Sequence, residues 1–364
     1  MSATEFPQVQ IMSSDGNSGV NTPNSSLSGK GHDAVIEIED IIKNLDISAD
    51  QYGNYAPRDP LESCVACGWT PEEHADEDYR SNITLFNVYG ARGVWKLGSK
   101  YVLKDTPASS PTYEAANLRF LKENSDIPIP TVIHDWIDSG RYFIMTSRIE
   151  GITLEQAWPS LSEDGKNRIA RQAGEQLEKL RKLTSPRIEG VDGKPFSEPS
   201  LSCKLFPGAT FGQHSISSDE ELWNEIEKPL ARVSGETRVQ MRASMPQCGP
   251  YTFTHGDLSC SNIMVKDGNF SGFLGFQGSG FLPVWYEYVS CRFAVGMIDM
   301  EWKQLLSAHI TRYPQAMLFH MARLGFMKDP TSTQALRYLN RIPDDAPMCP
   351  MVQVEAINLT PTDE

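Results

Sequence analysis

Long apolar runs, an excess of basic residues and an N-terminal targeting pattern are all missing from this sequence. No stretch of about 18 consecutive apolar residues occurs, which excludes an ordinary membrane-spanning helix. The polar N-terminus lacks the basic and apolar regions of a signal peptide, so we expect a cytoplasmic protein that does not contact membranes. The net charge of −14 disfavours nucleic acid and anionic lipid as general partners.

Cysteines in a disulfide or metal-binding pattern are also missing. The chain has seven cysteines, an odd number, and we expect them to be reduced in the cytoplasm. Cys64 and Cys67 lie close together and His74 follows, but no second pair of ligands completes the spacing of a zinc site. We interpret this segment as packing around Trp69, with a zinc site as the alternative.

Length and composition favour a two-lobed body with less regular ends. The 364 residues, of which 40% are hydrophobic, can bury a large core. Residues 1–32 are rich in Ser, Asn and Gly and are expected to be disordered. Residues 33–80 form an extension in which apolar residues at 33–47 recur at helical spacing, which predicts an amphipathic helix. The Pro-rich, polar segment 344–364 is expected to be a loose tail.

The central part of the chain changes from strand patterns to helix patterns. Short β-prone runs at 83–86, 93–97 and 101–104 are joined by Gly-containing turns, and a helix and a β-hairpin follow before residue 146. This pattern predicts an antiparallel N-lobe at 81–145. Helical periodicity after the N-cap residue Ser162 extends to about 184 and predicts a mainly helical C-lobe at 146–343. The expected fold class is therefore α+β.

The segment His255-Gly256-Asp257-Leu258-Ser259 lies between two apolar, β-prone runs. Asp257 and Asn262 stand five positions apart in this loop. That is the spacing at which kinase-like phosphoryl-transfer enzymes place the base for the acceptor hydroxyl and an oxygen ligand for Mg²⁺. A turn that is merely capped by an Asp and an Asn is the alternative.

Together with Asn262-Ile263-Met264-Val265, this loop resembles the catalytic loop of the aminoglycoside phosphotransferase family, and especially of its fungal branch. These are small-molecule kinases with the protein-kinase fold. The resemblance implies a small antiparallel-sheet N-lobe and a larger helical C-lobe. It also implies ATP and Mg²⁺ as cofactors, with Asp257 as the base and Asn262 as a metal ligand. The implied acceptor is a small molecule, and for the fungal branch it is a secondary metabolite.

The resemblance extends to residues that would hold the nucleotide. Lys104 is similar to the strand lysine that contacts the α and β phosphates, and Glu114 to the helical carboxylate that holds this lysine. Taken singly, each would be interpreted as an exposed surface charge. Segment 146–154 resembles the interlobe hinge, in which backbone groups of Thr146 and Arg148 would bind adenine beside Met145. A plain interdomain linker is the alternative.

The sequence departs from the family pattern where a metal-binding Asp is expected. Gly275 stands at that position, and the acid that follows in the family is replaced by Gln277. Mg²⁺ is usually bound by one or two carboxylates with phosphates and water, so the metal site is degenerate. Asp267 is a possible substitute, although its surroundings are typical of a hairpin turn.

Two functions are compatible with these residues. The first is transfer of phosphate from ATP to a hydroxyl of a small molecule, for which we expect Gly275→Asp to raise the rate. The second is a pseudokinase-like, non-phosphorylating protein with a binding or accessory role, or with acid–base chemistry at Asp257. Three of the aromatic residues between 186 and 223, Phe206, Phe211 and Trp223, favour an apolar or aromatic ligand, with core packing as the alternative.

Overall fold

The computed structural model describes residues 83–89, 92–108, 113–195, 206, 215–341 and 352–353. The chain divides into two units, residues 1–44 and 45–364, and every described residue belongs to the second. The predicted disorder at 1–32, the extension at 33–80 with its helix, and the cysteine segment around Cys64 lie outside the described residues.

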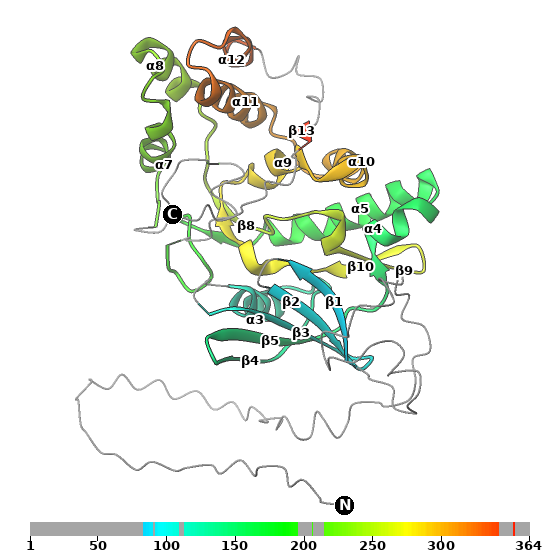
Figure 1. Ribbon diagram of the computed structural model, residues 1–364. Coiled ribbons are helices and arrows are strands. Elements are labelled where there is room, and N and C mark those ends of the chain that lie inside the picture. Colours follow the sequence, from blue (N-terminus) through cyan, green and yellow to red (C-terminus); the bar gives the residue numbers. More distant parts are fainter. Residues whose placement is uncertain are drawn as a thin grey trace, which may run out of the picture. The chain divides into compact units, whose positions relative to one another are not determined.

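A five-stranded antiparallel sheet forms the N-lobe, in the order β1-β2-β3-β5-β4 (Figure 1). Its strands are β1 (Ile83–Tyr89), β2 (Arg92–Leu97), β3 (Tyr101–Pro107), β4 (Val132–Asp138) and β5 (Arg141–Ser147). The strands predicted from the sequence are confirmed. The sheet continues to Ser147, past the lobe boundary that was expected at residue 145.

One helix, α3 (Glu114–Asn124), follows β3 and carries an apolar face into the core. Leu118 and Leu121 on this face are fully buried, and Ala115 is nearly so. The spacing of three and four residues puts these side chains on one side of the helix, together with Glu114 and Asn117. The sequence of this helix therefore places two polar side chains in a buried position.

The second lobe is mainly helical. Its longest helix, α5 (Glu163–Leu180), begins at the predicted N-cap, where Ser162 Oγ accepts a hydrogen bond from Gly165 N. The helix ends four residues before the predicted end at 184, because Thr184–Ser185 forms strand β7 instead. The other helices are α4 (Leu154–Ala157), α7 (Asp219–Ile226), α8 (Gly235–Ser244), α9 (Tyr286–Ser290), α10 (Gly296–Ser307), α11 (Pro314–Lys328) and α12 (Thr333–Leu339).

Small sheets fix the loops of this lobe. Their orders are β10-β9-β6, β11-β8-β7 and β12-β13. The strands are β6 (Ile152–Thr153), β7 (Thr184–Ser185), β8 (Tyr251–Thr254), β9 (Ile263–Lys266), β10 (Asn269–Phe273), β11 (Gly280–Leu282), β12 (Phe293–Ala294) and β13 (Val352–Gln353). β13 pairs in parallel with β12, so this part of the expected loose tail is hydrogen-bonded to the lobe.

The aromatic residues proposed for ligand binding fill the core instead. Phe206 and Trp223 are 4% and 5% exposed. The Phe206 ring lies 5.9 Å from the Trp285 ring and 6.0 Å from the Tyr286 ring. The prediction that these two residues contact a ligand is therefore wrong, because their surfaces are used in packing. Phe211 lies outside the described residues.

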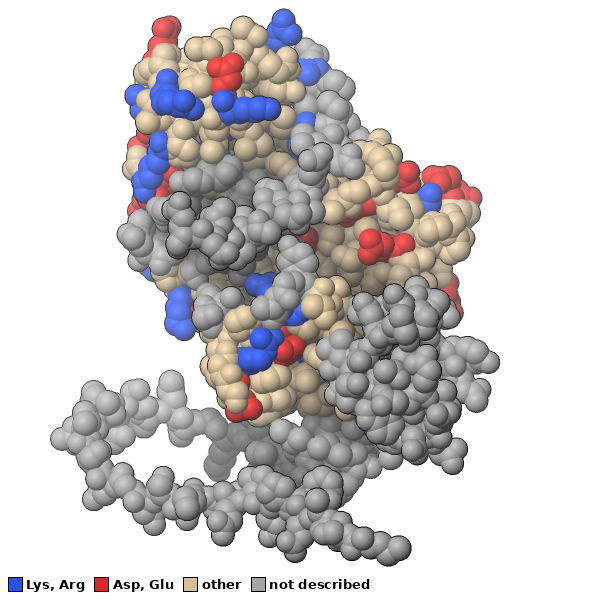
Figure 2. All heavy atoms as spheres, viewed as in Figure 1, with Lys and Arg blue, Asp and Glu red and all other residues tan. Residues whose placement is uncertain are grey.

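The surface of the described residues carries mixed charge. On the face drawn in Figure 2, basic and acidic side chains are interspersed, without a broad basic field among the described atoms. In the parts of the chain that the structure describes, no helix combines the length and apolar character needed to cross a membrane.

Candidate active site

The loop between β8 and β9 is built around a fully buried histidine. Asp257 N donates to His255 Nδ1 at 3.2 Å, so the ring proton resides on Nε2, which donates to Leu274 O at 2.7 Å. The next residue, Gly256, has φ 82, a left-handed conformation that glycine adopts without steric cost. Asp257 follows this turn and is only partly buried, whereas His255 is fully buried.

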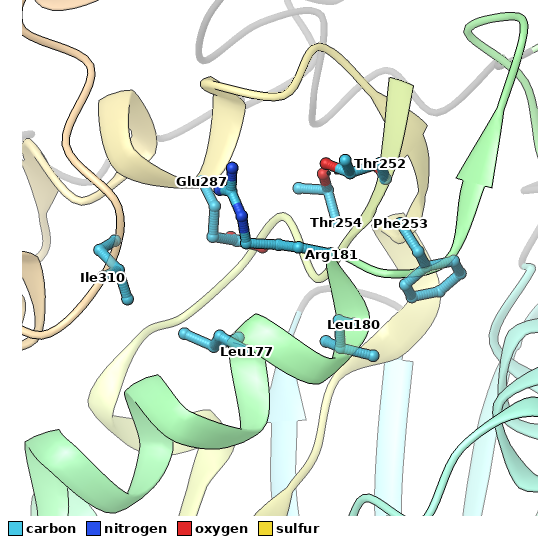
Figure 3. Close-up of a pocket in the computed structure, with 8 residues that line it drawn as sticks. All are labelled: Leu177, Leu180, Arg181, Thr252, Phe253, Thr254, Glu287 and Ile310. Carbon is cyan, nitrogen blue, oxygen red and sulfur yellow. Dashed lines mark hydrogen bonds between the residues drawn. The ribbon is translucent and has the colours of Figure 1, made fainter. Parts of the chain in front are cut away.

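Glu287 of α9 holds the same turn through two hydrogen bonds to its backbone. Its carboxylate oxygens accept hydrogen bonds from His255 N at 2.7 Å and from Gly256 N at 3.2 Å. Burial raises the pKa of Glu287 to about 7, although the two backbone donors and the nearby Arg181 favour the ionised form. Figure 3 shows Arg181 and Glu287 together at a hollow between α5, β8 and α9.

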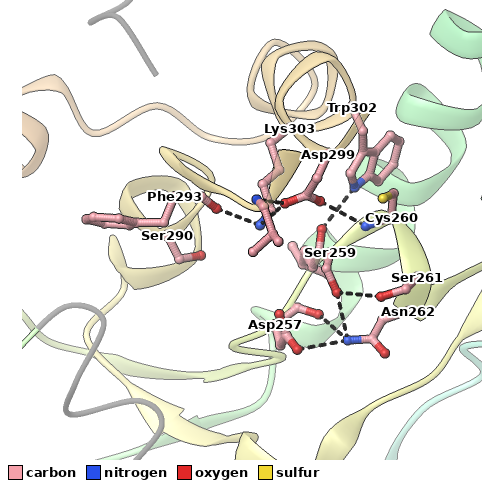
Figure 4. A network of polar contacts seen from close by, with 12 residues as sticks. Asp257, Ser259, Cys260, Ser261, Asn262, Ser290, Phe293, Asp299, Trp302 and Lys303 are labelled. Atoms are coloured by element: carbon pink, nitrogen blue, oxygen red, sulfur yellow. Dashed lines mark hydrogen bonds and ion pairs between the residues drawn. The ribbon is translucent and has the colours of Figure 1, made fainter. Parts of the chain in front are cut away.

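Helix α10 holds the other end of the loop (Figure 4). Asp299 accepts a hydrogen bond from Cys260 N at 2.9 Å and forms a 2.8 Å ion pair with Lys303, with both side chains buried. Trp302 Nε1 donates to Leu258 O at 2.9 Å. The loop is thus fixed at both ends by buried side chains, which the sequence analysis did not identify as site residues.

Asp257 and Asn262, the predicted base and metal ligand, lie in direct contact. Asn262 Nδ2 donates to Asp257 O at 2.9 Å and to Asp257 Oδ2 at 3.0 Å, and it lies 3.1 Å from Ser259 Oγ. The amide nitrogen therefore faces the carboxylate of Asp257 (Figure 4). Only the amide oxygen of Asn262 remains for any cation.

Gly275 adopts a conformation that suits glycine. Its φ of 83 and ψ of 43 lie in the left-handed region. A Cβ atom placed on Gly275 would lie 2.6 Å from both Cγ and Oδ1 of Asn262. The structure therefore has no side chain at this position and no space for one unless Asn262 moves.

The residues around Asn262 do not fit a magnesium ion. Among the described residues, no group of three or more His, Cys, Asp or Glu side chains could hold a metal. Asp267, the suggested substitute, lies in the turn after β9, five positions from Asn262, which corresponds to about 16 Å of extended chain. The idea that Asp267 replaces the missing carboxylate is therefore wrong.

On the N-lobe side, Lys104 Nζ and Glu114 Oε1 form an ion pair of 2.6 Å. The Lys104 side chain is 23% exposed and that of Glu114 is 6% exposed, so the carboxylate is the buried partner. One turn further along α3, Asn117 Nδ2 donates to Phe276 O at 2.8 Å and to Ser279 O at 2.9 Å. The helix thereby connects Lys104 to the segment that begins at Gly275 and contacts Asn262.

The predicted hinge residues are placed differently from the expectation. Met145 pairs with Leu103 and Thr146 with Val102, so Thr146 shares the sheet face of Lys104 whereas Met145 points to the opposite face. Met145 therefore does not stand beside a nucleotide on the Lys104 face.

The backbone of Arg148 is also engaged. Arg148 N donates to Lys100 O at 2.7 Å, which extends the pairing of β3 and β5 beyond Ser147. This N–H is therefore engaged within the sheet, and among the backbone groups of Arg148 the prediction is left with the carbonyl group. Within the described residues the next amide, Ile149 N, makes no hydrogen bond, so the candidate donor shifts by one residue.

Comparison with known families agrees with this arrangement. Residues 86–323 match the model of the phosphotransferase enzyme family, which is more than half of the chain. This chain belongs to that family. The resemblance inferred from the catalytic-loop residues is thereby confirmed, and the two lobes of this phosphotransferase-family chain have the predicted α+β organisation.

Individual relatives of this family member match it over a short segment in one case and over most of the chain in others. A segment of 39 residues is 51% identical to an aminoglycoside 3'-phosphotransferase of Enterococcus faecalis, and it covers 11% of this chain and 15% of that relative's length. Among solved structures, the streptomycin–ATP–APH(2″)-IIa complex is 15% identical with a TM-score of 0.43, over 74% of this chain and 92% of the other. A thermostable APH(4)-Ia mutant with ADP and hygromycin B is 15% identical with a TM-score of 0.45, over 71% and 91%.

Proposed function

We propose that this chain binds ATP between the five-stranded sheet and the helical lobe and transfers a phosphate to a hydroxyl of a small molecule. The observation that carries the proposal is the 2.6 Å Lys104–Glu114 ion pair, connected through α3 to the segment that contacts the Asp257 loop. Family membership supports the same reaction class. The resemblance to the fungal branch supports a secondary metabolite as acceptor, and we place the protein in the cytoplasm as expected from its polar N-terminus.

Each residue has a defined role in this proposal. Lys104 neutralises charge on the nucleotide phosphates, and Glu114 fixes its direction. Asp257 accepts the hydroxyl proton as that oxygen bonds to the γ-phosphorus and the bond from the phosphorus to ADP breaks. The buried contacts of Glu287 and Asp299 keep Asp257 in position. No step is assigned to magnesium, because the residues present do not fit it.

A second candidate function is nucleotide binding without transfer. Gly275 favours it, because the carboxylate that would hold a charge-neutralising metal ion against the phosphates is missing. Lys104 and Glu114 serve nucleotide binding equally in both functions. The two candidates therefore differ in turnover and agree in binding.

Calorimetric titration with ATP tests nucleotide binding. We expect Lys104→Met to weaken ATP affinity by about tenfold or more, because a charge that faces the phosphates is lost. Lys122→Met is the matched control, since Lys122 is exposed in the last turn of α3. Equal affinities for the two variants would refute the proposed phosphate contact.

Mass spectrometry of hydroxyl compounds incubated with ATP separates the two candidates. Transfer predicts a phosphorylated product together with ADP, and Asp257→Asn is expected to remove at least about 99% of this activity. ATP binding without any product across a broad panel of hydroxyl compounds would favour the second function.

A further inference from the structure

We propose that this site binds ATP without a divalent cation. The inference rests on the nucleotide binding in the proposed function, and it holds whether or not phosphate is transferred. In practice, Mg²⁺ is expected to add nothing to the affinity for ATP.

The first argument is the engagement of Asn262. Its Nδ2 atom donates to the backbone oxygen and the carboxylate of Asp257, so the N–H side of the amide faces the acceptors of the loop. One neutral amide oxygen remains. Mg²⁺ holds its water strongly and is usually bound through one or two carboxylates, so this oxygen alone does not replace its hydration.

The second argument is that the segment at Gly275 cannot turn to bring in another ligand. Leu274 N donates to Asn262 O at 2.8 Å, and Leu274 O accepts from His255 Nε2 at 2.7 Å. On the other side, Phe276 O accepts from Asn117. Hydrogen bonds on both flanks therefore fix Gly275, and its left-handed backbone leaves no space for a side chain beside Asn262.

The third argument is that the carboxylates around the loop already have partners. Glu114 pairs with Lys104, and Asp299 pairs with Lys303. Glu287 accepts two backbone hydrogen bonds beneath the His255 turn, and Asp257 accepts from Asn262. Recruiting any of these carboxylates to a cation would break a contact that holds the site together.

The fourth argument is the charge on the sheet. In the register of β2 and β3, Lys96 pairs with Val102 and Val94 pairs with Lys104, so Lys96 and Lys104 project from the same face. Positive charge on this face attracts free ATP more strongly than its magnesium complex, because bound Mg²⁺ neutralises two of the phosphate charges. The protein thus supplies positive charge to the phosphates but no anionic ligand to a metal.

Titration of the full chain with ATP in EDTA and in excess MgCl₂, at matched ionic strength, tests the inference. We expect the affinity in EDTA to equal or exceed that in MgCl₂ by up to about tenfold. A gain of about threefold or more from Mg²⁺ would overturn the inference while leaving nucleotide binding in place. Absence of binding in both buffers would overturn the proposed function, and this inference with it.

Titration of the ATP-bound chain with Mn²⁺, followed by electron paramagnetic resonance, gives a second readout. Mn²⁺ is a paramagnetic substitute for Mg²⁺, and its affinity for ATP is measured with and without protein. We expect the protein to leave this affinity unchanged or to lower it. Tighter Mn²⁺ binding in the presence of protein would show that the chain contributes ligands, and would contradict the inference.

Discussion

The side chain of Asn117 donates a 2.8 Å hydrogen bond to the backbone oxygen of Phe276, 159 positions further along the chain. A second bond reaches Ser279 O at 2.9 Å. Asn117 lies one helical turn after Glu114 and is fully buried. The contact therefore connects the helix that holds Lys104 to the segment in which Gly275 replaces the metal-binding Asp of the family pattern.

Removing this amide is expected to destabilise the protein strongly. Asn117→Ala leaves two buried backbone oxygens without their donor, at a combined cost of about 2–4 kcal/mol in the free energy of unfolding. Asn124→Ala is the control, because Asn124 of the same helix is exposed and donates to Phe120 O within its own helix. Urea denaturation measures both variants. Similar losses would mean that the buried contact contributes little.

Gly275 and Asn262 provide a prediction about steric fit. Gly275→Ala is expected to cost more than Gly140→Ala, although both residues have left-handed φ values, 83 and 74. An L side chain costs about 1–2 kcal/mol in this region, and at Gly140 a Cβ atom would meet nothing within 4 Å. The excess at Gly275 therefore measures the clash with Asn262.

A double-mutant cycle with Asn262→Ala isolates that clash. The excess cost of Gly275→Ala over Gly140→Ala is expected to disappear when Asn262 is truncated. If it persists, another neighbour limits the space. The same geometry changes the expectation that Gly275→Asp raises the phosphotransfer rate. Any gain in rate from the new carboxylate is offset by displacement of Asn262.

The sequence was informative where function depends on local patterns. Lys104 at the end of an apolar strand and Glu114 at the start of an amphipathic helix were recognised from short segments, and the structure pairs their side chains. The buried supports were not recognised, because Asp299 contacts a residue 39 positions away and Glu287 one 32 positions away. Such contacts depend on how the helices pack.

The hinge was harder to predict for a different reason. The groups expected to bind adenine there are backbone atoms, and whether they are available depends on strand register. A shift of one residue exchanges the two faces of a strand, so Thr146 rather than Met145 shares a face with Lys104. No side-chain pattern in this segment distinguishes these two registers.

The buried pair of Asp299 and Lys303 is expected to be important for stability. Asp299→Asn keeps the side-chain shape but leaves the Lys303 charge buried without its counter-charge, at a cost of about 3–5 kcal/mol. Asp126→Asn is the control, because the ion pair of Asp126 with Lys179 is exposed and is expected to contribute little. Thermal unfolding followed by circular dichroism compares the two. A loss for Asp299→Asn as small as for the control would contradict the role assigned to this pair.

Glu287 gives the protein a predicted pH dependence. Burial raises the pKa of its carboxyl from 4.5 to about 7, so the folded chain binds this proton more tightly than the unfolded chain. The resulting stability is fully present below pH 4.5 and is lost as the pH rises toward 7. A pKa change of this size corresponds to about 3 kcal/mol.

Glu287→Gln removes this titration and so isolates its effect. Between about pH 4.5 and 8, the wild type is expected to lose about 3 kcal/mol of unfolding free energy relative to the variant. Urea denaturation across this range measures the difference, with Glu236→Gln, an exposed position on α8, as a control expected to follow the wild type. A difference between wild type and Glu287→Gln that stays constant with pH would show that Glu287 does not titrate in this window. Its two hydrogen bonds to the His255 turn would then be made by a carboxylate that stays ionised throughout.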